Sequence, residues 1–315
     1  AISRGGSGSS DGTPSGSVAI GGNGGNGGSA GNVEVENYST LITQGDNAAG
    51  ISAQSLGGDA GIAATAHYAG FPVATNGTVG NAGAVVITNS GKVETFGKNS
   101  GGIGGLSQGA VAGAVTITNS GTVMTTGDQS FGISAQSLGE QSSGLVKVTN
   151  TRNIMTNGEN ANALEARSVI SDSKPTLSRF VASTRSVYLS NFLAVPSNGS
   201  AGNVVVNQTG NLIATGAGSS AIYAQSTGTN NGNIDITVEA GSTLIGGAAG
   251  GSGVSLLGGA QTTLVNSGII TAMGNTVGYI PLADGEMRAV GWVDGVAIRR
   301  PTANAATTST GLRLV

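Results

Sequence analysis

The chain alternates apolar and polar residues over short stretches, and these stretches return in the same order along most of its length. One of them, residues 115–119, reads V-T-I-T-N, so that every second side chain is apolar until the closing asparagine. Alternation with a period of two predicts a β-strand with one buried face. No part of the sequence has a strong helical period. We therefore expect an all-β protein.

Three such stretches make up one repeat, and the repeat occurs about six times. The first stretch ends in an asparagine, the second contains a threonine, and the third reads G-I-x-A-Q-S in its clearest copies. The steps from Asn89 to Asn119 and from Asn119 to Asn150 are 30 and 31 residues long. A period in this range indicates a solenoid. The expected fold is a right-handed parallel β-helix (β-solenoid) with three short strands per coil of roughly 30 residues.

The asparagine that closes the first stretch is predicted to point inward and to form an amide ladder along the stack. Stacked strands lie roughly 4.8 Å apart, so an amide side chain can bond to its equivalents above and below. The glycines that follow, as at Gly91 and Gly121, are expected to supply a positive φ in a turn. The copy near residues 236–246 carries Val238 instead. The predicted ladder residues are Asn37, Asn89, Asn119, Asn150, Asn207 and Asn266.

Two long steps between asparagines and a late loss of the pattern divide the chain. The first long step is 52 residues and predicts an insertion at about 61–83 within a solenoid of residues 1–275. The second is 57 residues and predicts another insertion at about 168–200. Residues 16–31 look like the end of a preceding repeat. Residues 276–315 are expected to form a divergent cap, or a segment that joins another module or subunit.

Composition narrows the function classes. Of 315 residues, 57 are glycine, 38% are hydrophobic and only 9% are charged. The regular spacing of the apolar residues argues against the disorder that such low charge and high glycine content would otherwise indicate. A net charge of −3 without a cluster of Lys or Arg disfavours nucleic acid as a partner. The chain has no cysteine and no run of 18 or more apolar residues, so we expect no disulfide, no zinc–thiolate site and no transmembrane helix.

The clearest copies are N-S-G-K-V-E-T-F-G at 89–97 and N-S-G-T-V-M-T-T-G at 119–127, with the ending G-I-S-A-Q-S-L-G at 50–57 and 132–139. They resemble the repeats in passenger regions of autotransporter and adhesin-like surface proteins of Gram-negative bacteria. The resemblance covers roughly residues 16–275 and implies a parallel β-helix on the outside of the cell, at the bacterial outer-membrane surface. Such passengers include adhesins, biofilm proteins and some enzymes. The chain shows neither a leader nor a recognisable translocator barrel, which implies cleavage or a fragment of a longer protein.

The leading hypothesis is a non-catalytic structural or adhesive protein that forms a stiff extracellular rod, without cofactor or metal. Open ends of a β-helix favour head-to-tail pairing with further copies, which would give filaments or a surface matrix for adhesion or biofilm formation. Surface glycans are the second expected partner. The outward column of the third strand is a candidate binding strip, and a plain solvent-facing sheet is the alternative interpretation. This strip comprises Gln54, Leu106, Gln136, Arg167, Gln225 and Leu257.

The alternative hypothesis is a polysaccharide-active β-helix enzyme that uses paired carboxylates. Asp128 and Glu159 follow the glycine of adjacent repeats, so stacking would place them about 5 Å apart, near the separation in retaining glycosidases. Asp46 and Lys98 occupy the same column, and Lys98 equally fits an exposed ion pair with Asp128. His67 is the only histidine and, without cysteine, makes a poor metal site.

Overall fold

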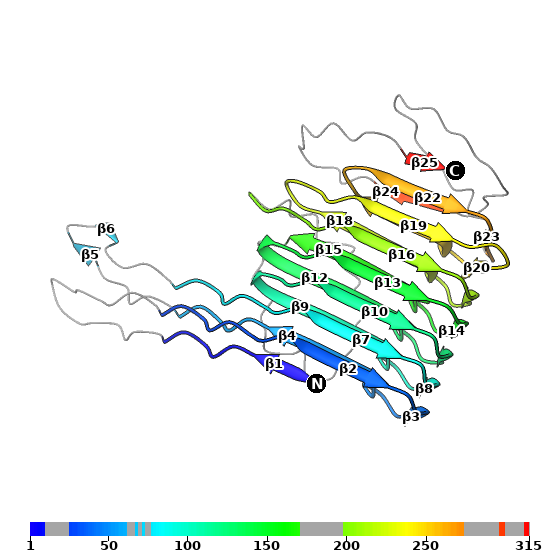
Figure 1. Ribbon diagram of the computed structural model, residues 1–315, viewed down its shortest axis with the longest axis horizontal. Coiled ribbons are helices and arrows are strands. Elements are labelled where there is room, and N and C mark those ends of the chain that lie inside the picture. Colours follow the sequence, from blue (N-terminus) through cyan, green and yellow to red (C-terminus); the bar gives the residue numbers. More distant parts are fainter. Residues whose placement is uncertain are drawn as a thin grey trace.

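The chain winds into a stack of coils with three flat sides, as seen in the computed structural model (Figure 1). Side chains and backbone are described for residues 1–9, 25–61, 77–170 and 198–273, and backbone alone for 67–68, 71–72, 296–299 and 312–314. Strands and turns make up this described part. It holds no helix long and apolar enough to cross a membrane.

Each coil adds one strand to each of three parallel sheets. Sheet A contains β1 (Ile2–Arg4), β4 (Ile51–Leu56), β9 (Ile103–Val111), β12 (Ile133–Ser142), β15 (Leu164–Ile170), β18 (Ser220–Thr227), β21 (Ser252–Gly258) and β24 (Val296–Arg299). Sheet B contains β2 (Val33–Asn37), β7 (Val85–Asn89), β10 (Val115–Asn119), β13 (Val146–Asn150), β16 (Val204–Gln208), β19 (Ile234–Val238), β22 (Thr262–Asn266) and β25 (Leu312–Leu314). Sheet C contains β3 (Leu41–Gln44), β8 (Val93–Phe96), β11 (Val123–Thr125), β14 (Ile154–Thr156), β17 (Leu212–Ala214), β20 (Thr243–Gly246) and β23 (Ile269–Ala272). The predicted parallel β-solenoid with three strands per coil is confirmed.

Like residues stack over like residues, and this builds the core. Val115 pairs with Val85 on one side and Val146 on the other, and Ile117 pairs with Ile87 in the same strands. All five side chains are fully buried. Because burial of one such side chain stabilises the fold by roughly 1.5–3 kcal/mol, continuous Val, Ile and Leu columns supply the main stabilising term. The β-branched residues also suit the extended backbone.

An amide ladder runs along the corner between sheets B and C. The Nδ2 group of Asn37 donates to Oδ1 of Asn89, Asn89 donates to Asn119, and Asn119 donates to Asn150, at 2.6–2.7 Å. Each amide also donates to the carbonyl oxygen two residues further on in its own turn, at 2.6–2.8 Å. One side chain therefore fixes its own turn and joins it to the next coil.

Asn207 is not in this ladder, and its predicted role is wrong. Gln208 pairs with Asn150 and accepts its Nδ2 at 3.1 Å, whereas Asn207 lies on the outward face of the strand. The strand reads V-V-V-N-Q, so the alternation that starts at its first valine puts glutamine, not asparagine, inside. Val238 occupies the next place and separates Asn266 from the ladder. The buried Nδ2 of Asn266 finds no hydrogen-bond acceptor in the described part of the chain.

Glycines in the ladder turns serve close packing rather than a positive φ, which corrects the expectation above. A Cβ atom on Gly121 would lie 1.8 Å from the carbonyl oxygen of Gly91, and one on Gly91 would lie 2.0 Å from that of Ser39. Neither glycine is among the residues with positive φ. Among residues other than glycine, a φ between 54° and 61° occurs in the turns after sheet C, at Asn47, Asn99, Gln129 and Asn160.

Hydroxyl groups line the other two corners. Ser137 is fully buried, donates to the carbonyl oxygen of Gly113 at 2.9 Å and accepts the N–H group of Gly144 at 2.8 Å. Thr125, at the remaining corner, donates to the carbonyl oxygen of Ser130 at 2.7 Å. A buried backbone group without a hydrogen-bond partner is costly. The hydroxyl columns supply such partners, so the backbone groups of the corner turns can be buried between coils.

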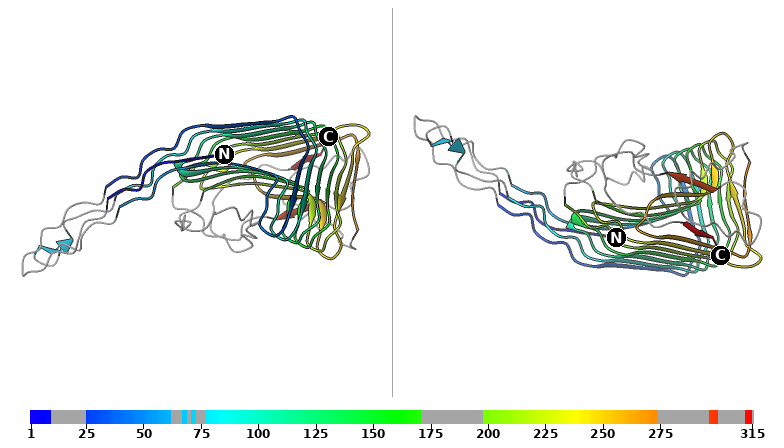
Figure 2. Two further views of the ribbon diagram at one scale, coloured as in Figure 1. Left: turned by 90° about the horizontal axis from the view of Figure 1, so that it is seen from below. Right: turned by 90° about the horizontal axis from the view of Figure 1, so that it is seen from above.

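A glycine-rich arm projects from the stack beyond sheets A and B (Figure 2). Its described segments are 5–9, 25–31, 57–61 and 77–83. The N–H groups of Gly58 and Gly61 donate to the carbonyl oxygens of Gly28 and Gly25, both at 2.8 Å, so contacts recur every third residue. A three-residue repeat is that of the polyproline II conformation, which has no internal hydrogen bonds and leaves the backbone free to bond to neighbours.

Glycine is required inside the arm because the four segments lie so close together. A Cβ atom on Gly58 would lie 1.9 Å from the carbonyl oxygen of Gly6, and one on Gly80 would lie 2.0 Å from that of Gly28. Gly6, by contrast, has open space at its Cβ position. The arm is therefore held by backbone hydrogen bonds that only glycine at these points permits.

The structure revises the predicted insertion boundaries. The first insertion starts at Gly57, directly after β4, rather than at 61, and carries the antiparallel pair β5 (His67–Tyr68) and β6 (Phe71–Pro72). Residues 25–31 are arm segments, not the end of a repeat. The second insertion starts later than predicted, because residues 168–170 belong to β15 and pair with β12. Residues 171–197, and 276–315 apart from β24 and β25, lie outside the described residues.

Candidate functional site

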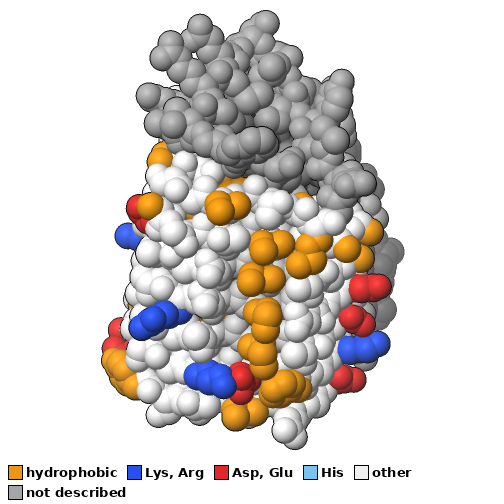
Figure 3. Space-filling view, turned by 90° about the vertical axis from the view of Figure 1, so that its right-hand side faces the viewer, with side chains coloured by type: hydrophobic (Ala, Val, Ile, Leu, Met, Phe, Trp, Pro, Cys, Tyr) orange, Lys and Arg blue, Asp and Glu red, His pale blue; other side chains and the backbone are white. Residues whose placement is uncertain are grey.

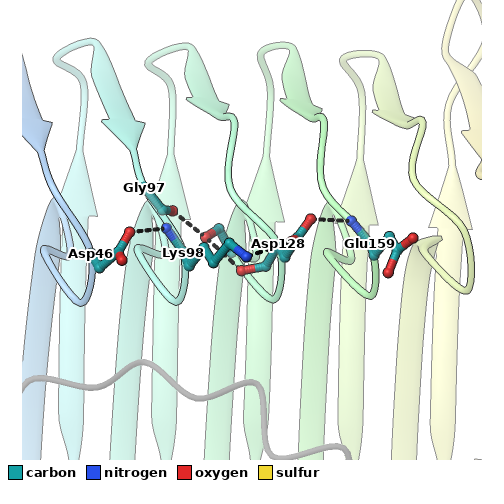
Figure 4. Close-up of polar contacts among 6 residues, drawn as sticks. Asp46, Gly97, Lys98, Asp128 and Glu159 are labelled. Carbon is teal, nitrogen blue, oxygen red and sulfur yellow. Dashed lines mark hydrogen bonds and ion pairs between the residues drawn. The ribbon is translucent and has the colours of Figure 1, made fainter.

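The column proposed for catalysis lies on the turns that follow sheet C (Figure 4). Oδ1 of Asp128 accepts the backbone N–H group of Glu159 at 3.1 Å, and its Oδ2 lies 3.6 Å from Nζ of Lys98. One coil earlier, Oδ1 of Asp46 accepts the backbone N–H group of Lys98 at 2.8 Å. These carboxylates therefore connect neighbouring turns.

The setting of this column does not suit general acid–base chemistry. The side chains of Lys98 and Asp128 are 68% and 46% exposed, and Glu159 is exposed as well. Both oxygens of Asp128 already have partners, and the turns form an open edge of the stack (Figure 4). A glycosidase needs two carboxyl groups that converge on one bond, with the pKa of the acid raised by its surroundings. The arrangement supports coil stacking instead.

The predicted binding strip on sheet A is not an open surface. Gln54 is 6% exposed, and Arg167 and Gln225 are each 3% exposed, although all three point away from the solenoid core. Leu106 is buried too, and Gln136 is half-buried. The expectation of solvent-facing side chains is therefore wrong.

Polar contacts along sheet A show what these side chains do instead. Nε of Arg167 donates to Oε1 of Gln225 at 3.0 Å, and the guanidinium lies 5.6 Å from the ring centroid of Tyr223. The neighbouring Glu165 is 4% exposed and accepts hydrogen bonds from Ser134 at 3.1 Å and from the Asn162 amide. Buried polar groups are normally paired in this way, so the column acts as a cross-coil network.

Sheet C carries an apolar surface that the sequence reasoning overlooked. One outward side chain from each of its strands lies in a line across the stack, visible as the central hydrophobic column in Figure 3. We call this line the sheet C stripe: Ile42, Glu94, Met124, Met155, Ile213, Ile245 and Thr271. Ile42 is 56% exposed and the others are half-buried. Flanking it on β23 and just beyond, Ile269 and Met273 are 58% and 53% exposed.

A signal for this stripe was present in the sequence. The second strands read V-M-T, I-M-T, L-I-A and L-I-G, with two apolar residues in a row where a half-buried strand would alternate. Only the inward residue of each pair is needed for the core. The second apolar residue therefore lies on the surface.

Glu36 on sheet B changes the pKa of a neighbouring tyrosine. The hydroxyl group of Tyr38 donates to Oε2 of Glu36 at 2.8 Å. This hydrogen bond, with the negative charge of Glu36, raises the pKa of Tyr38 above its ordinary value. Tyr38 is 68% exposed, so the contact marks the open end of the sheet rather than an active site.

Among the described residues, no group of three His, Cys, Asp or Glu side chains lies close enough together to bind a metal ion. His67 lies in β5, where only the backbone is described. Comparison with known proteins adds no assignment: no family model, curated protein or solved structure matches the chain.

Proposed function

We propose that this protein is a non-catalytic structural or adhesive component of a bacterial cell surface, in which the β-solenoid serves as a stiff rod. The observation that carries the proposal is the in-register stack itself. Three corner columns of amides and hydroxyls satisfy the turns from inside, as at Asn119, Ser137 and Thr125. Such a scaffold is rigid and presents extended faces rather than one concave pocket.

Its place outside the cell rests on the resemblance of the repeats to passenger regions of surface proteins. Two features of the chain agree with that setting. The described core holds its backbone bonds within continuous parallel sheets, which leaves few segments for a protease to engage. The absence of cysteine removes any dependence on redox conditions.

Self-assembly of the rods into filaments or a matrix is part of the proposal. A contact that joins the end of one stack to the other end of the next copy does not close on itself and therefore propagates. The polysaccharide-active alternative has lost its main support, since Asp128 and Glu159 lie on neighbouring, solvent-exposed turns.

Electron microscopy of concentrated purified protein, combined with adhesion of protein-coated beads to bacterial or host-cell surfaces, tests this proposal. We expect rods or filaments, bead adhesion above that of albumin-coated beads, and no release of reducing ends from a polysaccharide panel. Release of reducing ends that scales with protein and disappears in Asp128→Asn would establish the enzyme instead. Compact particles without adhesion would overturn the structural proposal.

A further inference from the structure

The sheet C stripe crosses seven strands of the described stack and contains one charged residue, Glu94. Five of its seven members are Ile or Met, and four of these, from Met124 to Ile245, lie on successive strands. Apolar surface patches of this size on monomeric proteins are often functional. Met is also well suited to adapt its shape to an opposing surface.

The one charge in the stripe is already neutralised. Glu94 is paired with Nζ of Lys92 at 2.7 Å, and its side chain is only 15% exposed. Both residues belong to the same coil, so a second surface can cover the ion pair without separating the two side chains. Covering the stripe therefore does not strand an unpaired carboxylate, which is the usual obstacle to burying a charge.

We propose that the stripe pairs laterally with the stripe of a second copy of this chain, with the two stacks antiparallel. Sheets pack face to face about 10 Å apart, and side chains repeating every 4.8 Å fit best against a surface with the same repeat. The stripe has seven positions with Met155 at the centre. A two-fold axis through Met155 brings Met124 opposite Ile213 of the second copy.

Charge selects the antiparallel arrangement. In parallel stacks each residue would face itself, so the two Lys92–Glu94 ion pairs would meet with their carboxylates directly opposite each other. In antiparallel stacks Glu94 faces Ile245 of the second copy, and the two ion pairs lie at opposite ends of the contact. Like charges directly opposite one another are destabilising, so the antiparallel pair is favoured.

The size of the stripe predicts a weak contact. Six strand steps of roughly 4.8 Å make it about 29 Å long, and a width on the order of 10 Å gives about 300 Å² per copy. A stable interface buries roughly 800 Å² per partner. Pairing is therefore transient in dilute solution and becomes effective where copies are held close together, as on a surface or in a filament.

Cysteine cross-linking tests this pairing directly, because the native chain has no cysteine. We expect Met155→Cys to form a disulfide-linked dimer under mild oxidation at high protein concentration. The matched control is Thr149→Cys, a half-buried outward position of the same coil on sheet B. It should cross-link at least tenfold more slowly. Adding Met124→Lys to the Met155→Cys chain should abolish its dimer.

The relative orientation of the two stacks is tested by mixing two variants. Met124→Cys mixed with Ile213→Cys should give the mixed dimer in preference to either self-linked dimer, whereas preferential self-linking of Met124→Cys would overturn the antiparallel arrangement. Equal cross-linking of Met155→Cys and Thr149→Cys, with both thiols reactive toward a small maleimide, would overturn the pairing itself.

Circular dichroism of each variant confirms that the stack is folded. The pairing goes beyond the rod-like role, since monomeric adhesive rods would refute the pairing and leave the rod intact.

Discussion

Removing one amide from the middle of the ladder should destabilise the whole stack. In Asn119→Ala, the Nδ2 group of Asn89 loses its acceptor in the next coil, and Oδ1 of Asn150 loses its donor. The carbonyl oxygen of Gly121 loses the Nδ2 donor in the same turn. All three asparagines are fully buried, so water does not replace the missing partners without opening the turn.

The magnitude follows from the number of groups left unpaired. A buried polar group without a partner costs roughly 1–3 kcal/mol, and three are created. Asn89 keeps its second bond, to the carbonyl oxygen of Gly91, so its share is small. The other two groups give an expected loss of about 2–6 kcal/mol, which is large beside the roughly 5–15 kcal/mol that stabilises a typical domain.

Guanidinium unfolding followed by far-ultraviolet circular dichroism measures this loss. Thr118→Ala is the matched control, because Thr118 is the neighbouring residue on the same strand and points to solvent. It should change stability by less than about 0.5 kcal/mol. Asn119→Val refills the volume without the amide and should remain at least about 2 kcal/mol less stable than the native chain. A native-like midpoint for both Asn119 variants would refute a stabilising role for the ladder.

Three further predictions concern other parts of the stack. Gly58→Ala should let the amide hydrogens of the arm exchange with solvent, whereas Gly6→Ala should not, since only the first places a Cβ atom against backbone. Hydrogen exchange measured by mass spectrometry checks this, and equal protection of the arm amides in the two variants would contradict the packing. Ser137→Ala should lower the unfolding free energy by about 2–4 kcal/mol, because two backbone groups lose their partner; an unchanged denaturation midpoint would count against it. Asp128→Asn should change stability by less than about 1 kcal/mol in thermal unfolding, because its cross-coil contacts are exposed, and a larger loss would show that they contribute more to stacking than exposed contacts do.

The stack could be predicted because its strands are nearly identical copies. Val115, Ile117 and Asn119 return at matching positions, and alternation alone sends them inward. The same rule applied strictly would have chosen Gln208 over Asn207. The error came from matching the amino-acid type rather than the position within the strand.

Surface features were harder to predict because alternation shows which way a side chain points but not what lies beyond it. Gln54 and Gln225 do point out of the solenoid, yet both are buried. The arm escaped notice for a different reason. Its glycines repeat every third residue, a period with neither strand nor helix character, and Gly58 shows that the need for glycine comes from a neighbouring segment distant in sequence.

The central claim is that successive coils stack in register, and distances between spin labels test it most directly. With one label at Thr88→Cys, the second is moved along the outward column of sheet B to Thr149, Asn207, Thr237 and Val265. The separations should be about 10, 14, 19 and 24 Å before allowance for the label arms, since each coil adds roughly 4.8 Å. The step from Thr149 to Asn207 should equal the others although it spans the second insertion. A clearly longer step there, or distances that do not rise in order, would contradict the stack.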